Sequence, residues 1–203
     1  MNIFDYIEKW SNDIGNKIGE NETEDDREVY RYAVFGIFSQ IFTFGIAFLI
    51  AWLLNVFIPF FIVVSSFVLL RIGGGGYHCS CFRDCFITSL TVFFCGTFIA
   101  YLTQDYVISM FIISLLLGIY IIPQCPKPSV NSPSRGYKED KKFRYKYIRY
   151  FVLLMCFNLI FIYYKHFLFS TAISSGIIIS VFMISDIGEY ILKNIWDIIH
   201  KNN

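Results

Sequence analysis

The sequence has little charge and lacks the patterns that mark several common protein classes. Charged residues make up 16% of its 203 positions and the net charge is +1, so bulk electrostatics favour neither a nucleic acid nor an acidic macromolecule as partner. The glycine run 73–76 is not followed by a phosphate-loop lysine, which argues against a nucleotide site. Residues 1–18 carry acids and bases throughout, so no signal peptide is expected and the internal spans must direct membrane insertion.

The six cysteines do not have the spacing of a disulfide framework. Two lie inside apolar stretches, whereas Cys79, Cys81 and Cys85 crowd into one short segment. Together with His78 these three would supply enough ligands for a metal, but the H-C-x-C-x3-C spacing is unlike a familiar zinc pattern. We therefore expect no metal and no other cofactor.

The chain is apolar enough to belong in a bilayer. Hydrophobic residues make up 56% of it, aromatic residues 20%, and the mean hydropathy is +0.54, which exceeds what a soluble domain of this size carries. A crossing takes about 20 residues, so each of three long apolar blocks holds two helices. The expected spans are 33–54, 56–70, 86–103, 106–122, 148–164 and 167–185.

These spans predict an all-α polytopic membrane protein of about six transmembrane helices, with residues 1–203 forming a single membrane domain. A core of four full spans with two half-inserted segments is the alternative. With six spans, the N-terminus, the segment 71–85, the loop 123–147 and the C-terminus share one side. That side holds all 17 Lys and Arg residues except Lys165, and the positive-inside rule makes it cytoplasmic.

Residues 1–32 predict an amphipathic N-terminal segment, because apolar residues recur at helical spacing from Ile3 to Ile18. The stretch from Glu20 to Glu28 is strongly acidic, so anionic lipid would repel it. A docking helix for a partner, a lid over the chain's own site, and a helix that packs on its own bundle are all open interpretations.

The segment 123–149 is the most basic part of the chain. Contact with lipid headgroups is one interpretation. The other is a cradle for an acidic peptide, with Lys141, Lys142 and Arg144 as the candidate contacts.

The segment 71–85 carries the residues that cysteine-protease chemistry requires. Such an enzyme needs a thiolate nucleophile, a histidine that holds and later delivers the proton, and donors for the oxyanion. Cys85 is the candidate nucleophile and His78 the candidate base. Glycine N–H groups of 73–76, or Arg71 and Arg83, are the candidate donors. A histidine in a juxtamembrane loop with structural cysteines nearby is the alternative, which spacing alone favours.

The spacing of His78 and Cys85 also constrains the local structure. Seven residues of continuous helix would separate them by about 10.5 Å, beyond hydrogen-bond reach. His78 is therefore expected on a loop or broken turn that folds back toward Cys85, which the glycines permit. Cys85 at a helix N-terminus would have a lowered thiol pKa.

The segment resembles the accessory gene regulator protein B (AgrB) family of membrane peptidases. The likeness rests on an arginine at the end of a span, a Gly-Gly-x-His core, a cysteine seven residues after the histidine and a serine one turn on: Arg71, Gly75, Gly76, Tyr77, His78, Cys85 and Ser89. A later loop, Cys125-Pro-Lys-Pro-Ser-Val-Asn-Ser-Pro-Ser, resembles the family's proline-containing loop. Cys79 and Cys81 depart from the pattern, which leaves open which thiols besides Cys85 react.

The resemblance implies that His78 and Cys85 are the catalytic pair of a cysteine endopeptidase in the bacterial cytoplasmic membrane. It implies a small peptide precursor as substrate, with an amphipathic leader, a core containing Cys or Ser, and an acidic tail. The peptidase would remove the tail and leave the core as a thiolactone or lactone for quorum sensing. Membrane lipids and a second copy of the chain are further expected partners, and nucleic acid is not.

Two polar residues near this segment are open to more than one interpretation. Gln40, a lone amide in the first span, either faces the site or hydrogen-bonds a neighbouring helix. Asp84 precedes Cys85, but adjacent residues on a helix point about 100° apart, so it is a weak candidate for orienting His78.

Two functions of other classes are the rivals to a peptidase. A small membrane transporter or exporter would carry ionisable residues within its spans or paired broken helices, and the spans hold few such residues. A non-catalytic membrane adaptor would tolerate loss of Cys85.

Overall fold

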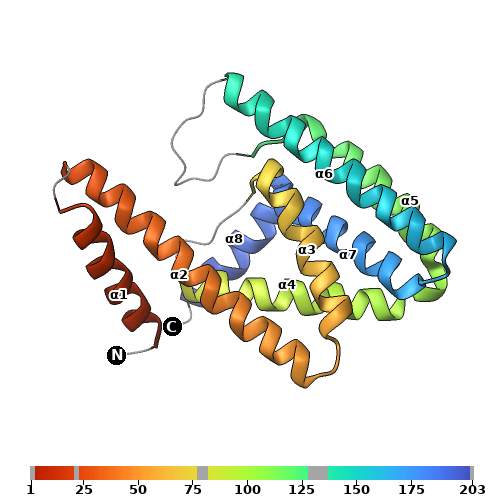
Figure 1. Ribbon diagram of the computed structural model, residues 1–203, viewed down its shortest axis with the longest axis horizontal. Helices are drawn as coiled ribbons and strands as arrows, with labels where there is room; N and C mark the ends of the chain where they lie inside the picture. Colours follow the sequence, from red (N-terminus) through yellow and green to blue (C-terminus); the bar gives the residue numbers. More distant parts are fainter. Residues whose placement is uncertain (1–2, 21–22, 77–81, 128–136, 202–203) are drawn as a thin grey trace.

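The computed structural model describes residues 3–20, 23–76, 82–127 and 137–201, and its named elements in these ranges are all helical. In chain order they are α1 (Ile3–Ile18), α2 (Glu24–Leu53), α3 (Phe57–Gly74), α4 (Phe82–Leu102), η1 (Gln104–Tyr106), α5 (Val107–Tyr120), η2 (Ile122–Gln124), α6 (Tyr137–Tyr163), α7 (Phe167–Ile184) and α8 (Asp186–Lys201). Figure 1 shows their arrangement.

Six of the helical stretches are long and apolar enough to cross a membrane. They are Val34–Leu53, Phe57–Gly74, Phe82–Leu102, Gln104–Gln124, Glu139–Tyr163 and Phe167–Ile184. Helices suit this role because each satisfies its own backbone hydrogen bonds in lipid. The predicted all-α fold with six spans is confirmed, and the chain is a multi-pass membrane protein.

Helix α7 is the centre of the bundle and packs against α3, α4, α5 and α6. Its residues from Ser170 to Ile184 are buried, apart from the half-buried Ile178 and Phe182. Small residues permit this close packing: a Cβ on Gly176 would lie 2.7 Å from the carbonyl oxygen of Val63 on α3.

Buried hydrogen bonds join α7 to its neighbours. The Nδ2 of Asn158 on α6 donates to Oγ of Ser174 (2.8 Å), and the Ser170 hydroxyl donates to the Asn158 carbonyl. On α5, the Ser114 hydroxyl lies 3.4 Å from that of Ser174. These bonds satisfy polar side chains that water cannot reach inside the bundle.

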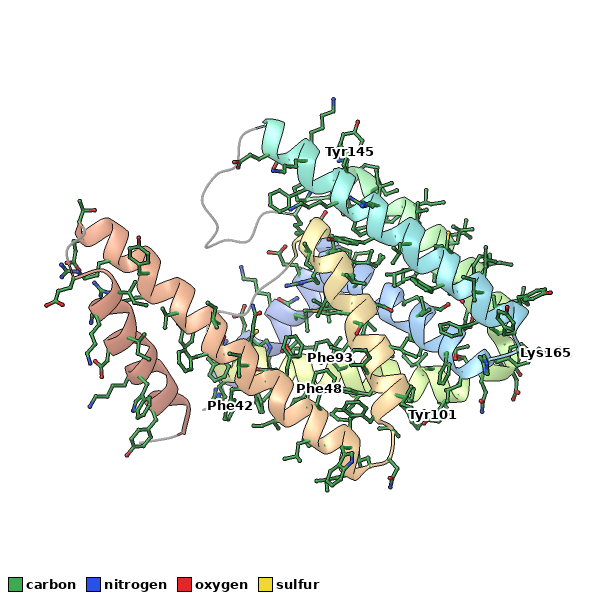
Figure 2. The ribbon with its side chains drawn as sticks, viewed as in Figure 1. Phe42, Phe48, Phe93, Tyr101, Tyr145 and Lys165 are labelled. Carbon is green, nitrogen blue, oxygen red and sulfur yellow. The ribbon has the colours of Figure 1, made fainter. Side chains whose placement is uncertain are left out.

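Aromatic side chains fill the junction of α2, α3 and α4. The Phe48 and Phe60 ring centroids are 5.6 Å apart, and the Phe93 centroid is 6.2 Å from that of Phe60. Figure 2 shows Phe48 and Phe93 in this junction, with Phe42 nearer the start of α4.

The predicted amphipathic helix with its apolar stripe from Ile3 to Ile18 is confirmed as α1, and a second helix, α2, begins at Glu24 within the segment 1–32. Helix α1 packs along the first half of α2, where a Cβ on Gly15 would lie 2.6 Å from Cα of Arg31. The acidic residues from Glu24 onward belong to α2. Figure 1 shows α1 and the first half of α2 to one side of the other helices. Among the three interpretations of this segment, the contacts of α1 with α2 favour a helix that packs on its own chain.

Two predicted boundaries need correction, and one helix is additional to those predicted. Helix α3 continues through Gly74, so the predicted segment 71–85 begins inside a helix. Helix α6 begins at Tyr137, so the later part of the predicted loop 123–147 is helical. The C-terminal helix α8 was not predicted. Its residues at steps of four, Gly188, Leu192, Trp196 and His200, face the rest of the protein, whereas Ile187, Ile191, Ile195 and Ile198 are exposed.

Candidate functional site

The glycine run at 73–76 has two different roles. Gly73 and Gly74 lie within α3, where a Cβ would come 2.3 Å from the backbone nitrogen of Tyr147 and 2.5 Å from Cδ1 of Ile184, respectively. Gly75 (φ 68°) and Gly76 (φ 121°) end the helix with positive φ, which side chains disfavour. The first pair therefore permits helix packing, and only the second pair turns the chain.

Arg71 in the last turn of α3 lies over this turn. Its guanidinium carbon is 5.6 Å from the centroid of the Phe67 ring, and a Cβ on Gly76 would lie 2.5 Å from its Nη1. The structure therefore brings together Arg71 and Gly76, two of the predicted site residues.

Lys127 fastens the loop after α5 to the same turn. Its N–H donates to the Gly74 carbonyl (2.9 Å), and its carbonyl accepts from the Gly76 N–H (3.4 Å). Its Nζ lies 2.7 Å from Asp186 and 2.6 Å from Glu189, at the start of α8, and only 13% of the side chain is exposed. Burial lowers the pKa of Lys127, but the hydrogen bonds and charges of Asp186 and Glu189 outweigh it, so the pKa is raised.

Cys85 lies in the first turn of α4, partly buried. The adjacent α2 packs on this turn through rings: the centroid of Phe42 is 6.0 Å from that of Phe82 and 5.7 Å from that of Phe86. The first turn of a helix presents N–H groups and a positive dipole end, which favour a thiolate. His78, Tyr77, Cys79 and Cys81 lie outside the described residues.

Asp84 is a fully buried carboxylate beside Cys85. Its Oδ2 lies 2.6 Å from Nε2 of His200 on α8, and its Oδ1 lies 3.4 Å from Nε of Arg83. One turn further along α4, the Thr88 hydroxyl accepts a hydrogen bond from Nε1 of Trp196 (3.1 Å). His200 and Trp196 were not identified from the sequence as neighbours of this turn. These two residues are four positions apart, as are Asp84 and Thr88, and this matching helical spacing is the pattern that could have indicated them.

Other predicted site residues lie apart from Cys85 or have another role. Gln40 is exposed on α2. It lies two residues before Phe42, whose ring contacts the start of α4, so the two side chains point about 200° apart around the helix axis and Gln40 faces away from α4. Lys141 and Lys142 are exposed on α6. Arg144 donates from Nε to the Cys125 carbonyl (2.8 Å) and from Nη2 to the Pro123 carbonyl (3.3 Å), so it stabilises the loop after α5.

Cys125 in that loop differs from Cys85, because its surroundings make its thiol unreactive. It is 1% exposed. Burial raises the pKa of the Cys125 thiol to about 12, although the charge of Arg144 opposes this. The protonated thiol is a poor nucleophile.

Comparison with known proteins gives a family for the whole bundle. No curated protein and no solved structure matches the chain. The family model described as Accessory gene regulator B matches residues 7–184, from α1 to the end of α7. Because this match covers most of the 203 residues, the chain belongs to the Accessory gene regulator B (AgrB) family, which acts in the processing of quorum-sensing peptides.

Proposed function

We propose that this chain is a cysteine endopeptidase that processes the precursor of an autoinducing peptide, with Cys85 as nucleophile and His78 as base and acid. The observation that carries the proposal is the position of Cys85 in the first turn of α4, in a chain whose family acts on such peptides. Helix N-termini favour the thiolate that this chemistry needs.

The proposed reaction begins when the Cys85 thiolate attacks the carbonyl carbon at the junction of core and tail. The peptide C–N bond breaks, a thioester to Cys85 forms, and the amine of the acidic tail leaves with the proton held by His78. A cysteine or serine within the core then attacks the thioester carbonyl, and its proton passes to His78 or to the released thiolate. The product is a thiolactone or lactone, and Cys85 is regenerated without consuming water.

Arg71 is the proposed oxyanion donor among the described residues. The glycine N–H groups, expected as donors from the sequence, already have protein acceptors: Gly75 donates to the Arg71 carbonyl (3.0 Å) and Gly76 to the Lys127 carbonyl. The Arg71 side chain instead lies over the turn that precedes α4. A guanidinium can stabilise the developing negative charge of a tetrahedral intermediate.

Two exposed lysines are the proposed contacts of the acidic tail. Lys141 and Lys142 lie in the first turns of α6, and charge-assisted contacts to carboxylates would both steer and hold the tail. Arg144 lies near these lysines on α6, but its side chain donates hydrogen bonds to two loop carbonyls, so its main role is structural.

The proposed site is on the cytoplasmic face of the bacterial membrane. The turn at Gly75–Gly76, the start of α6 and helix α8 lie at one end of the bundle, and the short connections at Asn55, Thr103 and Lys165 lie at the other. Figure 2 shows Lys165 far from Tyr145, which lies in the basic first turns of α6. The positive-inside rule then assigns the end with the basic residues to the cytoplasm.

The test is mass spectrometry of the purified protein in liposomes with a synthetic precursor. The intact protein should give an adduct on Cys85 and a product one water lighter than the linear core. Cys85→Ala should abolish cleavage and ring closure, and His78→Ala should nearly do so. Cys95→Ala, which removes an exposed thiol further along the same helix, is the matched control and should remain active. Full cleavage by Cys85→Ala would refute the mechanism.

A further inference from the structure

Helix α8 contacts both described ends of the α3–α4 connection. Its first turn binds Lys127, which pairs with Gly74 and Gly76 at the end of α3. Its last turns bind the first turns of α4. The family match ends at residue 184, before this helix begins.

The contact with the end of α3 joins the mostly buried Lys127 to two more exposed carboxylates and is supported by backbone bonds. Lys127 is anchored by two carboxylates, and its backbone is bonded on both sides of Gly75. A Cβ on Gly75 would lie 2.3 Å from the Lys127 carbonyl oxygen. The path from Asp186 and Glu189 to the glycine turn is therefore continuous and closely packed.

The contact with the start of α4 is a matched pair of polar contacts. His200 meets Asp84, and four residues earlier on α8 Trp196 meets Thr88, four residues later on α4. The two helices therefore run antiparallel where they touch, and residues four apart on each helix share a face. Cys85 lies in the turn of α4 that these two contacts enclose.

The Asp84 contact has the larger consequence because that carboxylate is buried. Only 1% of its side chain is exposed, and a buried carboxylate is costly without charged or hydrogen-bonding partners. His200 is one such partner and Arg83 another. Loss of His200 therefore favours movement of the Asp84 turn, and with it Cys85, toward water.

We propose that α8 is a strap that positions Cys85, with Lys127, Trp196 and His200 as positioning residues. The inference rests on the proposed function, because positioning matters only if Cys85 reacts with substrate. A nucleophile must be held close to its productive geometry by residues around it. The strap does so by tying the end of α3 and the start of α4 to one rigid element.

The test measures kcat and KM for precursor cleavage, together with the rate at which iodoacetamide modifies Cys85, located by peptide mass spectrometry. His200→Ala should lower kcat by about tenfold, with KM nearly unchanged, since small misplacements of a reacting group are costly. It should raise the modification rate, because the turn that carries Cys85 moves toward water. His200→Gln keeps a hydrogen-bond donor for Asp84 and should recover most of the loss. Lys127→Glu should also lower kcat, and adding Glu189→Lys should restore part of it.

The controls separate positioning from general damage. His166→Ala removes an exposed histidine at the start of α7, at the opposite end of the bundle, and should leave both rates unchanged. If His200→Ala does not fold, Trp196→Phe keeps an aromatic ring but removes the Nε1 donor to Thr88, and it should lower kcat about threefold. Wild-type rates in the folded His200 and Trp196 variants would overturn the strap, whereas cleavage by Cys85→Ala would overturn the proposed function instead.

Discussion

The imidazole of His200, near the C-terminus, lies 2.6 Å from the carboxylate of Asp84, the residue immediately before Cys85. The two residues are 116 positions apart in the chain. Asp84 is buried, whereas 43% of the His200 side chain is exposed. Substitution of the exposed His200 can therefore measure how much this contact stabilises the buried Asp84.

The first prediction concerns stability. His200→Ala should lower the free energy of unfolding by about 1 kcal/mol, because a buried acceptor loses a partner but keeps Arg83. His200→Gln should cost less. Thermal unfolding in detergent measures the difference, with His166→Ala as control. An unfolding temperature for His200→Ala equal to that of the wild type would show that the contact contributes nothing to stability.

The second prediction concerns the glycine turn. Gly75→Ala should destabilise the protein by about 1–3 kcal/mol, because alanine disfavours positive φ and its Cβ would meet the Lys127 carbonyl. Gly45→Ala is the matched control, since a Cβ there meets nothing within 4 Å. The yield of folded protein and its unfolding temperature measure both. Equal behaviour of the two variants would contradict the described turn.

The third prediction concerns the pH dependence of Cys125 modification. A thiol with a pKa of about 12 is thiolate in about one molecule in ten thousand at pH 8, against about one in ten for the ordinary pKa of 9.0. Because the pKa is raised, the rate of maleimide modification should stay low at neutral pH and rise about tenfold per pH unit up to pH 11.

The matched comparison for Cys125 is the same residue in the detergent-unfolded chain. It should react about a thousandfold faster at pH 8, because only folding shifts its pKa. Rapid modification of folded Cys125 at pH 7 would contradict its burial beneath Arg144.

The fourth prediction separates the basic residues of α6. Neutralising Lys141 and Lys142 together should raise KM for a precursor with an acidic tail at low ionic strength and leave the unfolding temperature unchanged, because both are exposed. Arg144→Ala should lower the unfolding temperature, since it removes two bonds to loop carbonyls. An unchanged KM in the double lysine variant at low ionic strength would return this surface to contact with lipid headgroups.

The fifth prediction concerns sidedness. An impermeant thiol reagent added to intact cells should leave Cys85 unmodified and should modify it in inverted vesicles, because the charge distribution assigns this end of the bundle to the cytoplasm. Lys165→Cys supplies the opposite control and should react from outside. Modification of Cys85 in intact cells would contradict the proposed topology.

The sequence alone determined the membrane fold and the residues that carry the resemblance to the AgrB family. Spanning helices can be predicted locally because in lipid each helix satisfies its own backbone, so length and apolar composition are enough. The position of Cys85 near a helix start followed from the same boundary between charged and apolar residues. The position of α8 was also present in the sequence, as isoleucines at 187, 191, 195 and 198, a helical spacing that was overlooked.

Only the tertiary structure decided which distant residues meet around that turn. Local periodicity predicts a helix but not its partner, so it could not bring His200 to Asp84 or Lys127 to Asp186 and Glu189. Arg144 illustrates the same point: its charge suggested a peptide contact, whereas the fold places its guanidinium against two loop carbonyls. The division of the glycine run also depended on packing, since only the fold shows that α3 needs glycine at position 73, where Tyr147 of α6 approaches too closely for a side chain.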